Sequence, residues 1–239
     1  MLRINYKEEP LKIGKISCWI TLIFALYNII LFLLFSAPFI NISNIIIPDY
    51  MNGFLISTQL VSSIFLLFIW FSFREMTKLN EQLVQTNDRI NYLLGSIIAA
   101  TFLSLISGPV TKIICENNIS DVCTSYLSMS LLILGMLMIH ISLILIGTIL
   151  TKIKLSLNTG TIFNQLGIVL ILSGIVYIIS IPFTLLREYD AVNFSFITII
   201  LEITGFNIKI LTAISLILMA RLFLTFPIAL LKKKSTQKK

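Results

Sequence analysis

The stretch YLSMSLLILGMLMIHISLILIGTIL, residues 126–150, decides the fold class of this chain. It contains no Lys, Arg, Asp or Glu. A helix needs about 20 apolar residues to cross the hydrocarbon layer of a membrane, and this stretch is longer than that. Similar apolar stretches recur along the chain with short connections between them. We therefore predict an all-α polytopic integral membrane protein.

The recurring stretches predict six transmembrane helices in one domain, residues 1–239. They lie near 16–40, 54–73, 92–112, 126–150 and 166–186, with one more inside 196–231. The chain is 57% hydrophobic and 12% charged, which is less charge than a soluble domain presents to water. The first stretch exceeds the apolar core of a signal peptide, about 7–15 residues, so we expect no cleavage there.

The last apolar region is longer than one span, and its placement stays open. A span at 210–231 puts Arg221 near the middle of the membrane. A span at 196–220 instead puts Glu202 and Lys209 inside the membrane and Arg221 at its edge. A break near Gly205 that lets the chain re-enter is the third interpretation. Each placement brings charge into the membrane, where ionisable groups are functional candidates.

Lys and Arg are concentrated in the N-terminal arm, the connections 74–91 and 151–165, and the tail. This bias predicts that both termini are cytoplasmic. Trp19, Trp70 and Tyr92 fall at the inner ends of spans, where aromatic rings prefer the interface. The 74–91 connection is expected to extend the second helix as a solvated end or a docking surface. We expect a cell membrane protein, in the cytoplasmic membrane of a bacterium.

The net charge of +7 points to lipid rather than to nucleic acid, because the cations flank apolar spans. Anionic lipid headgroups are therefore the expected partners of the basic termini. The tail contains Lys232, Lys233, Lys234, Lys238 and Lys239.

Three outward-going helices each carry a Ser-x-Pro sequence, and this spacing suggests a repeat. The prolines Pro38, Pro109 and Pro182 are 71 and 73 residues apart (109 − 38 and 182 − 109). Aligning them stacks Leu22, Leu93 and Leu166. One interpretation is three repeated helical hairpins of about 72 residues. The other is that similar span lengths produce the same spacing.

Two further features concern packing and covalent links. Ser96, Ala100, Ser104 and Gly108 form a small-residue stripe that lets another helix approach closely. That neighbour is a helix of the same chain, a second copy or another membrane protein. Cys115 and Cys123 flank a predicted outer loop and are a candidate disulfide.

Polar residues at membrane depth are the candidate site. They are Asn28, Gln59, His140, Glu202, Lys209 and Arg221. The alternative for Asn28, Gln59 and His140 is interhelical hydrogen bonding. The alternative for Arg221 is a side chain that reaches back to the cytoplasmic face on its long stem.

The sequence has no phosphate-binding loop, no His-Glu-x-x-His, no Gly-x-Ser-x-Gly and no paired carboxylates within a span. We therefore expect no enzymatic activity, cofactor or metal. The first functional hypothesis is a non-catalytic accessory, regulatory or protective component that acts through helix–helix contacts. The alternative is a transporter or channel subunit for a small solute, whose cavity is lined by Asn28, Gln59, His140 and Arg221. The charge of Arg221 would favour an anion.

Overall fold

The computed structural model describes residues 8–35, 49–78, 83–115, 121–153, 157–189 and 195–236. Side chains are described over 10–30, 61–78, 83–106, 129–153, 159–186, 197 and 199–225. The helices are α2 (Glu8–Phe35), α3 (Asp49–Thr77), α4 (Gln85–Cys115), α5 (Asp121–Leu150), α6 (Leu157–Tyr189) and α7 (Ser195–Thr236). No strand occurs among the described residues.

Five of these helices contain a stretch long and apolar enough to cross a membrane. The stretches are Pro10–Ile30, Gln85–Ile106, Met129–Leu150, Thr159–Leu186 and Ile199–Thr225. The chain is therefore a helical, membrane-embedded protein. The predicted span 54–73 lies in α3, whose first side chains are outside the described residues, so the sixth span remains a prediction.

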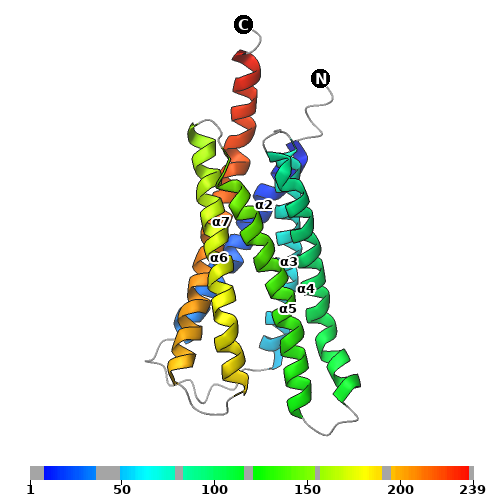
Figure 1. Ribbon diagram of the computed structural model, residues 1–239. Coiled ribbons are helices and arrows are strands. Elements are labelled where there is room, and N and C mark those ends of the chain that lie inside the picture. The colour runs from blue at the N-terminus through cyan, green and yellow to red at the C-terminus, as the bar shows by residue number, and fades with distance from the viewer. Residues whose placement is uncertain are drawn as a thin grey trace.

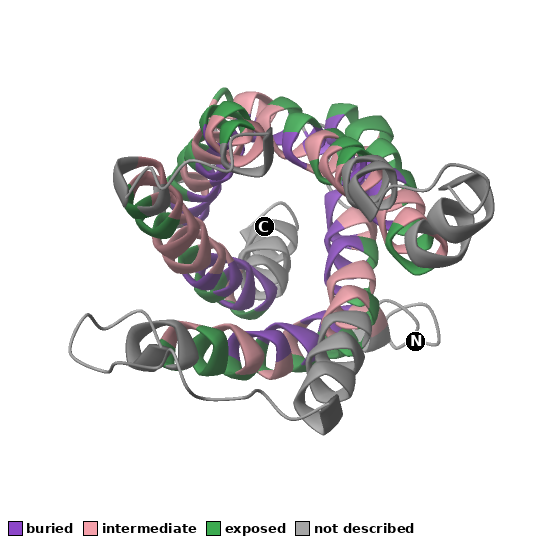
Figure 2. Ribbon diagram, turned by 90° about the horizontal axis from the view of Figure 1, so that it is seen from below, coloured by how far each residue is buried: buried purple, intermediate pink, exposed green. Residues whose placement is uncertain are grey.

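The helices alternate in direction and form a closed ring. Each helix packs mainly against its neighbours in the chain, and α7 returns to pack against α2. Figure 2 looks along the bundle and shows the helices around a common centre. The start of α2 and the end of α7 lie at the same end, which we call the termini end, and α7 extends past the other helices there (Figure 1).

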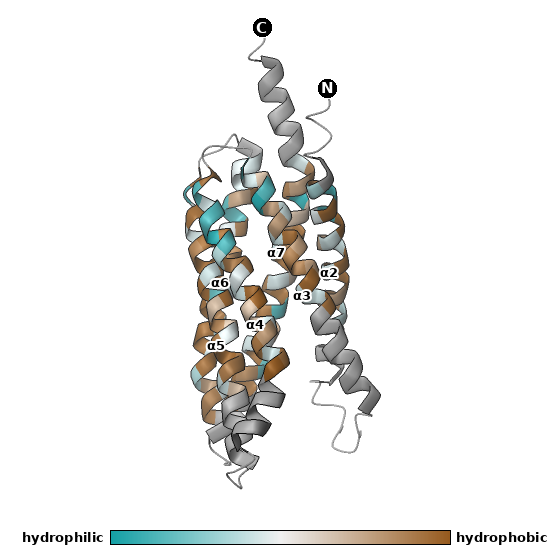
Figure 3. Cartoon of the chain, turned by 90° about the vertical axis from the view of Figure 1, so that its right-hand side faces the viewer, coloured by the Kyte–Doolittle hydropathy of each residue, from teal (hydrophilic) through white to brown (hydrophobic). Residues whose placement is uncertain are grey.

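Several helices begin earlier than the apolar stretches predict. α2 starts at Glu8 rather than near 16, α4 at Gln85 rather than near 92, and α6 at Leu157 rather than near 166. Membrane thickness limits the length of the apolar segment but not of the helix, because the backbone bonds of a helix are made within it. The added turns carry polar residues, and Figure 3 shows the hydrophilic residues gathered towards the termini end.

α7 is continuous over 42 residues, so the predicted break near Gly205 is wrong. No glycine among the described residues has a positive φ, and Gly205 is therefore in a conformation that other residues adopt equally well. The apolar stretch Ile199–Thr225 includes Glu202, Lys209 and Arg221 together. Which part of this stretch lies in the membrane remains a prediction.

The second helix was expected to continue past residue 73 as a solvated end or a docking surface, but α3 ends at Thr77, and described residues on both sides of the connection are buried in the bundle. Met76 and Leu83 are fully buried. The Thr77 hydroxyl lies 2.5 Å from Asn87 Oδ1 and joins the end of α3 to the start of α4. Lys78 and Glu75 form an exposed ion pair of 2.6 Å, which contributes little to stability.

Small residues bring neighbouring helices close together at two seams. A Cβ on Gly147 of α5 would lie 2.6 Å from the carbonyl oxygen of Gly167 of α6, and a Cβ on Gly167 would lie 2.7 Å from that of Gly147. At the α4–α5 seam, Ser96 Oγ is 3.4 Å from Ser142 Oγ. Ala100 crowds Gly135 there, since a Cβ on that glycine would lie 3.0 Å from Ala100 Cα. Ser96 and Ala100 of the predicted small-residue stripe therefore pack within the chain, whereas Ser104 is exposed and the Gly108 position lies outside the described side chains.

Among the described side chains, the core lies next to the termini end. The most deeply buried large side chains belong to the parts of their helices nearest that end. They are Ile69, Phe73, Met76, Leu83, Ile90, Leu93, Ile146, Leu150, Phe163, Leu166 and Leu222. Trp70 is also buried, at 2% exposure, so its ring faces the core rather than lipid, and its depth at the inner end of a span remains a prediction.

Candidate functional site

Contacts between helices show which residues lie at the same depth. A Cβ on Gly14 of α2 would lie 2.5 Å from Ser72 Cβ of α3 and 2.9 Å from Phe223 Cζ of α7. These three residues are therefore level. α2 runs away from the termini end, whereas α3 and α7 run towards it. Counting fourteen residues away from that end therefore leads from Gly14 to Asn28 on α2 (14 + 14) and from Phe223 to Lys209 on α7 (223 − 14). A helix rises about 1.5 Å per residue, so this level is ~21 Å away along the bundle.

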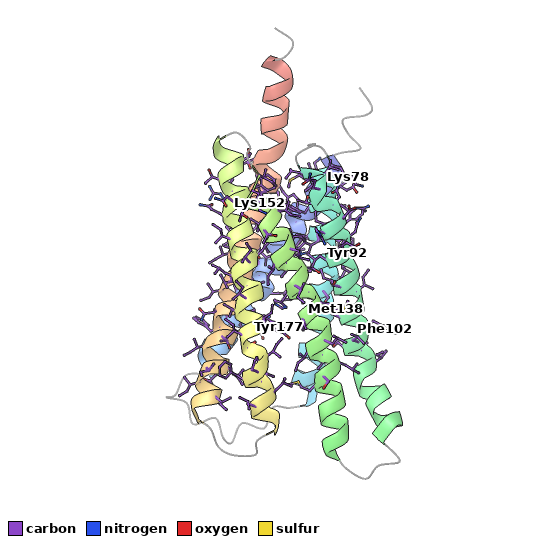
Figure 4. The ribbon with its side chains drawn as sticks, in the orientation of Figure 1. Lys78, Tyr92, Phe102, Met138, Lys152 and Tyr177 are labelled. Atoms are coloured by element: carbon purple, nitrogen blue, oxygen red, sulfur yellow. The ribbon has the colours of Figure 1, made fainter. Side chains whose placement is uncertain are left out.

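The same reasoning places residues of α3, α5 and α6. Phe73 of α3 and Phe163 of α6 approach with ring centroids 6.2 Å apart. Fourteen residues from them are position 59 on α3 (73 − 14) and Tyr177 on α6 (163 + 14). Tyr177 stacks on His140 of α5 at a centroid distance of 3.9 Å and an interplanar angle of 7°. Figure 4 shows Tyr177 well away from Lys78 and Lys152, which lie at the termini end.

The structure thus places four polar residues from different helices at one depth. We call Asn28, His140, Tyr177 and Lys209 the polar belt. Gln59 occupies a backbone position at the same depth, and its side chain lies outside the described residues. The sequence placed these residues within the membrane but did not show that they share a level, and it did not identify Tyr177.

His140 packs against a neighbouring helix and keeps one ring nitrogen able to accept a hydrogen bond. Its Nδ1 lies 2.7 Å from the Met136 carbonyl oxygen. A carbonyl oxygen only accepts, so Nδ1 donates and carries the hydrogen. In the neutral ring Nε2 is then the acceptor. His140 was expected to hydrogen-bond a neighbouring helix, but its hydrogen bond stays within α5, and its contact with α6 is the stack on Tyr177.

On α2, α4 and α5, the face that is buried near the termini end becomes exposed further along the helix. On α2, Gly14, Ser17 and Thr21 are buried, and Asn28 is on the same face because it follows Thr21 by seven residues. Asn28 is nevertheless exposed. A buried face that becomes exposed along the same helix has lost the neighbour that covered it.

α4 and α5 show the same change. On α4, Leu93 and Ile97 are buried, and Ser104, seven residues after Ile97, is exposed. On α5, Leu150 is fully buried, and Met136, fourteen residues before it, is 40% exposed. We define the vestibule as the uncovered helix faces that carry Asn28, Ser104 and Met136. Among the described side chains, these residues lie on the side away from the termini end.

The charged residues of α7 divide between two faces. Lys209 is half-buried and precedes the buried Ala213 and Leu216 by four and seven residues. It therefore lies on the same face of α7 as these two residues, nearer the vestibule. Arg221 is exposed and shares its face with the exposed Ile214 and Leu224. It is two residues from Phe223 and therefore lies at the depth of the packed core, away from the polar belt.

Glu202 is exposed and precedes Lys209 by seven residues, which is ~10 Å further from the termini end at the rise of a helix. Cys115 ends α4 and Cys123 lies in the first turn of α5, but their side chains are outside the described residues, so the disulfide remains a prediction. Within the described part of the chain, no group of three or more His, Cys, Asp or Glu side chains could hold a metal ion.

Phe73 and Phe163 were not singled out in the sequence, because each is one of 17 phenylalanines in uniformly apolar segments. Only their meeting across the ring distinguishes them. No protein-family model matches this chain, and no curated protein or solved structure matches it. The functional argument therefore rests on the geometry of the polar belt and the vestibule.

Proposed function

We propose that this chain is a transporter or channel component that binds a small solute at the polar belt, with the vestibule as the entrance. The observation that carries the proposal is the change in exposure along single helix faces, which leaves Asn28, Ser104 and Met136 uncovered. Membrane transporters commonly hold their solute near mid-membrane between helices that open to one side at a time. The vestibule and the polar belt fit that design.

The charge of Lys209 supports an anionic solute. A cation at membrane depth is retained where it serves a partner or a pathway, because burying it in lipid is costly. Arg221 contributes less to this proposal, since it is on the exposed face of α7 and at another depth. Its surroundings fit a side chain that reaches the headgroup region on its long stem.

An accessory role through helix–helix contacts remains the second proposal. Its support in the sequence is the near absence of ionisable groups at membrane depth, the short loops and the small-residue stripe of α4. Ser96 and Ala100 of that stripe contact Ser142 and Gly135 of α5, so this part of the stripe is used inside the chain. The geometry therefore supports solute binding better than docking through this stripe.

We further propose that the termini face the cytoplasm and that the vestibule opens away from it. The cations Lys12, Lys78, Arg89 and Lys152 lie near the ends of helices at the termini end. Cationic loops favour the cytoplasmic side. These cations also support anionic lipid headgroups as partners at that end.

Cysteine accessibility tests the vestibule. In a background with Cys18, Cys115 and Cys123 changed to Ser, Asn28→Cys is expected to react with a membrane-impermeant maleimide added on the side opposite the termini. The matched control is Ile30→Cys, because Ile30 is exposed at a similar depth but on the opposite face of α2. A thiol facing lipid remains protonated and unreactive, because the thiolate is the nucleophile.

A second pair repeats the test on α4. Ser104→Cys is expected to react, and Phe102→Cys, which replaces an exposed phenylalanine on another face, is not. Silence at both Asn28→Cys and Ser104→Cys would mean that the vestibule contains no water, and solute binding there would be rejected. Equal reaction of all four variants would also contradict a vestibule, because the labelling would not distinguish the faces.

A further inference from the structure

Phe73 and Phe163 meet across the ring rather than between neighbouring helices. In the order of packing, α3 and α6 are opposite each other, with two helices between them on either side. Both rings are fully buried, and their planes are inclined by 52°. Trp70 packs edge-on against Phe73, with ring centroids 5.6 Å apart and an interplanar angle of 83°. Three aromatic side chains therefore occupy the centre of the ring.

This aromatic cluster lies between the polar belt and the termini end. It is level with Gly14, Ser72 and Phe223, fourteen residues along the helices from the polar belt. Ile69 and Met76, which flank it on α3, are fully buried as well. Any path from the vestibule towards the termini end has to pass this level.

We propose that Phe73 and Phe163, backed by Trp70, are the closed gate of a solute path through the ring. The proposal rests on the proposed function, because it assigns a barrier to the path that begins in the vestibule. An apolar constriction excludes water and so stops a polar solute without a charged barrier. Aromatic rings in tilted and edge-on contact attract each other, yet they part without breaking a hydrogen bond.

The two gate residues belong to different groups of closely packed helices. α4, α5 and α6 are joined by the Ser96–Ser142 contact and by the crowded pair Gly147 and Gly167. α2, α3 and α7 meet where Gly14 admits Ser72 and Phe223. Phe163 belongs to the first group and Phe73 to the second, and the two groups also meet at an extensive α6–α7 seam and a looser α3–α4 seam. Opening the gate would therefore widen the α3–α4 seam while α6 pivots on α7.

Labelling from the two sides of the membrane tests the gate. The reporter is Asn28→Cys in the background without native cysteines, probed with the same impermeant maleimide. With the native gate, labelling is expected only from the side opposite the termini. With Phe73→Ala and Phe163→Ala together, labelling is expected from both sides. Lys78→Cys identifies the termini side in each preparation, because Lys78 is exposed at that end.

The matched control is Phe223→Ala in the same reporter. Phe223 is also a buried phenylalanine at this level, but it packs against Gly14 in the α2–α7 seam and not across the ring. It removes one phenyl ring from this level, as each single gate substitution does, and is expected to leave labelling one-sided. If Phe223→Ala opens the termini side as fully as the gate variant does, general loosening explains the result and the gate is rejected.

The remaining outcomes separate the two proposals. One-sided labelling that persists in the double alanine variant overturns the gate and leaves the vestibule intact. Labelling from both sides with native Phe73 and Phe163 also overturns the gate. An unreactive Asn28→Cys in every background overturns the vestibule itself. Should the double variant not fold, the series Phe163→Leu, Val and Ala replaces it, and termini-side labelling must rise as the side chain shortens.

Discussion

Gly147 and Gly167 face each other across α5 and α6 with no room for a methyl group on either. Added Cβ atoms would lie 2.6 and 2.7 Å from the opposing carbonyl oxygens. Backbone atoms cannot move aside as a flexible side chain can, so any larger residue separates the helices. Gly95 of α4 is different, because a Cβ there would meet nothing within 4 Å.

These two environments predict opposite results for the same substitution. Gly147→Ala is expected to lower the free energy of unfolding by about 1–3 kcal/mol, as overpacking does in a tight interior. Gly95→Ala is expected to be neutral or to raise it by about 0.5–1 kcal/mol, because alanine loses less backbone freedom in a helix. Thermal unfolding midpoints of the purified variants in detergent provide the measurement. Equal midpoints for both variants would contradict the close α5–α6 contact.

At the scale of the element, α7 differs from the other helices in its length and its charge. It has 42 residues, and its apolar stretch contains Glu202, Lys209 and Arg221. Thr204 Oγ1 and Asn207 Nδ2 donate to carbonyl oxygens of their own helix, at 2.9 Å to Ile200 and 2.9 Å to Ile203. Polar side chains in a membrane helix can make their hydrogen bonds to the backbone of the same helix in this way, without a partner helix.

Gly205→Ala tests whether α7 is continuous. The substituted Cβ would meet nothing within 4 Å, and the backbone at this position does not need a positive φ. We expect a thermal midpoint equal to or above that of the wild type, from a gain of up to about 1 kcal/mol. A clearly lowered midpoint would mean that the chain turns at Gly205 and that the glycine is required there.

On the scale of the whole molecule, the ring is packed towards the termini end, and its described side chains are less buried away from that end. Neighbouring helices alternate in direction, so the ends of α3 and α5 and the start of α2 share the termini end (Figure 1). The termini end therefore faces either the cytoplasm or the opposite side of the membrane as a unit. The distribution of cations predicts that it faces the cytoplasm.

Lys78→Cys and Lys152→Cys, each in the background without native cysteines, measure that orientation. Both residues are exposed at the termini end, so both thiols are expected to be labelled only from the cytoplasmic side. Labelling of both from the other side would reverse the orientation but keep the fold. Labelling of one from each side would contradict the fold.

The class of the protein and most of its helices could be predicted from the sequence, because each membrane helix makes its backbone hydrogen bonds within itself. A local run of apolar residues, such as residues 126–150, is then enough. The three leucines that the proline spacing aligned, Leu22, Leu93 and Leu166, are all buried. The threefold repeat itself remains a prediction.

What only the tertiary structure decided is which face of each helix points to the centre of the ring. The helices are apolar on every side, because lipid and protein interior select similar side chains, so amphipathicity does not mark the inner face. Trp70 therefore looked like an interfacial anchor and lies in the core, while Phe73 and Phe163 gave no local signal. The shared depth of Asn28, His140, Tyr177 and Lys209 likewise depends on how four helices align, which no local stretch of sequence contains.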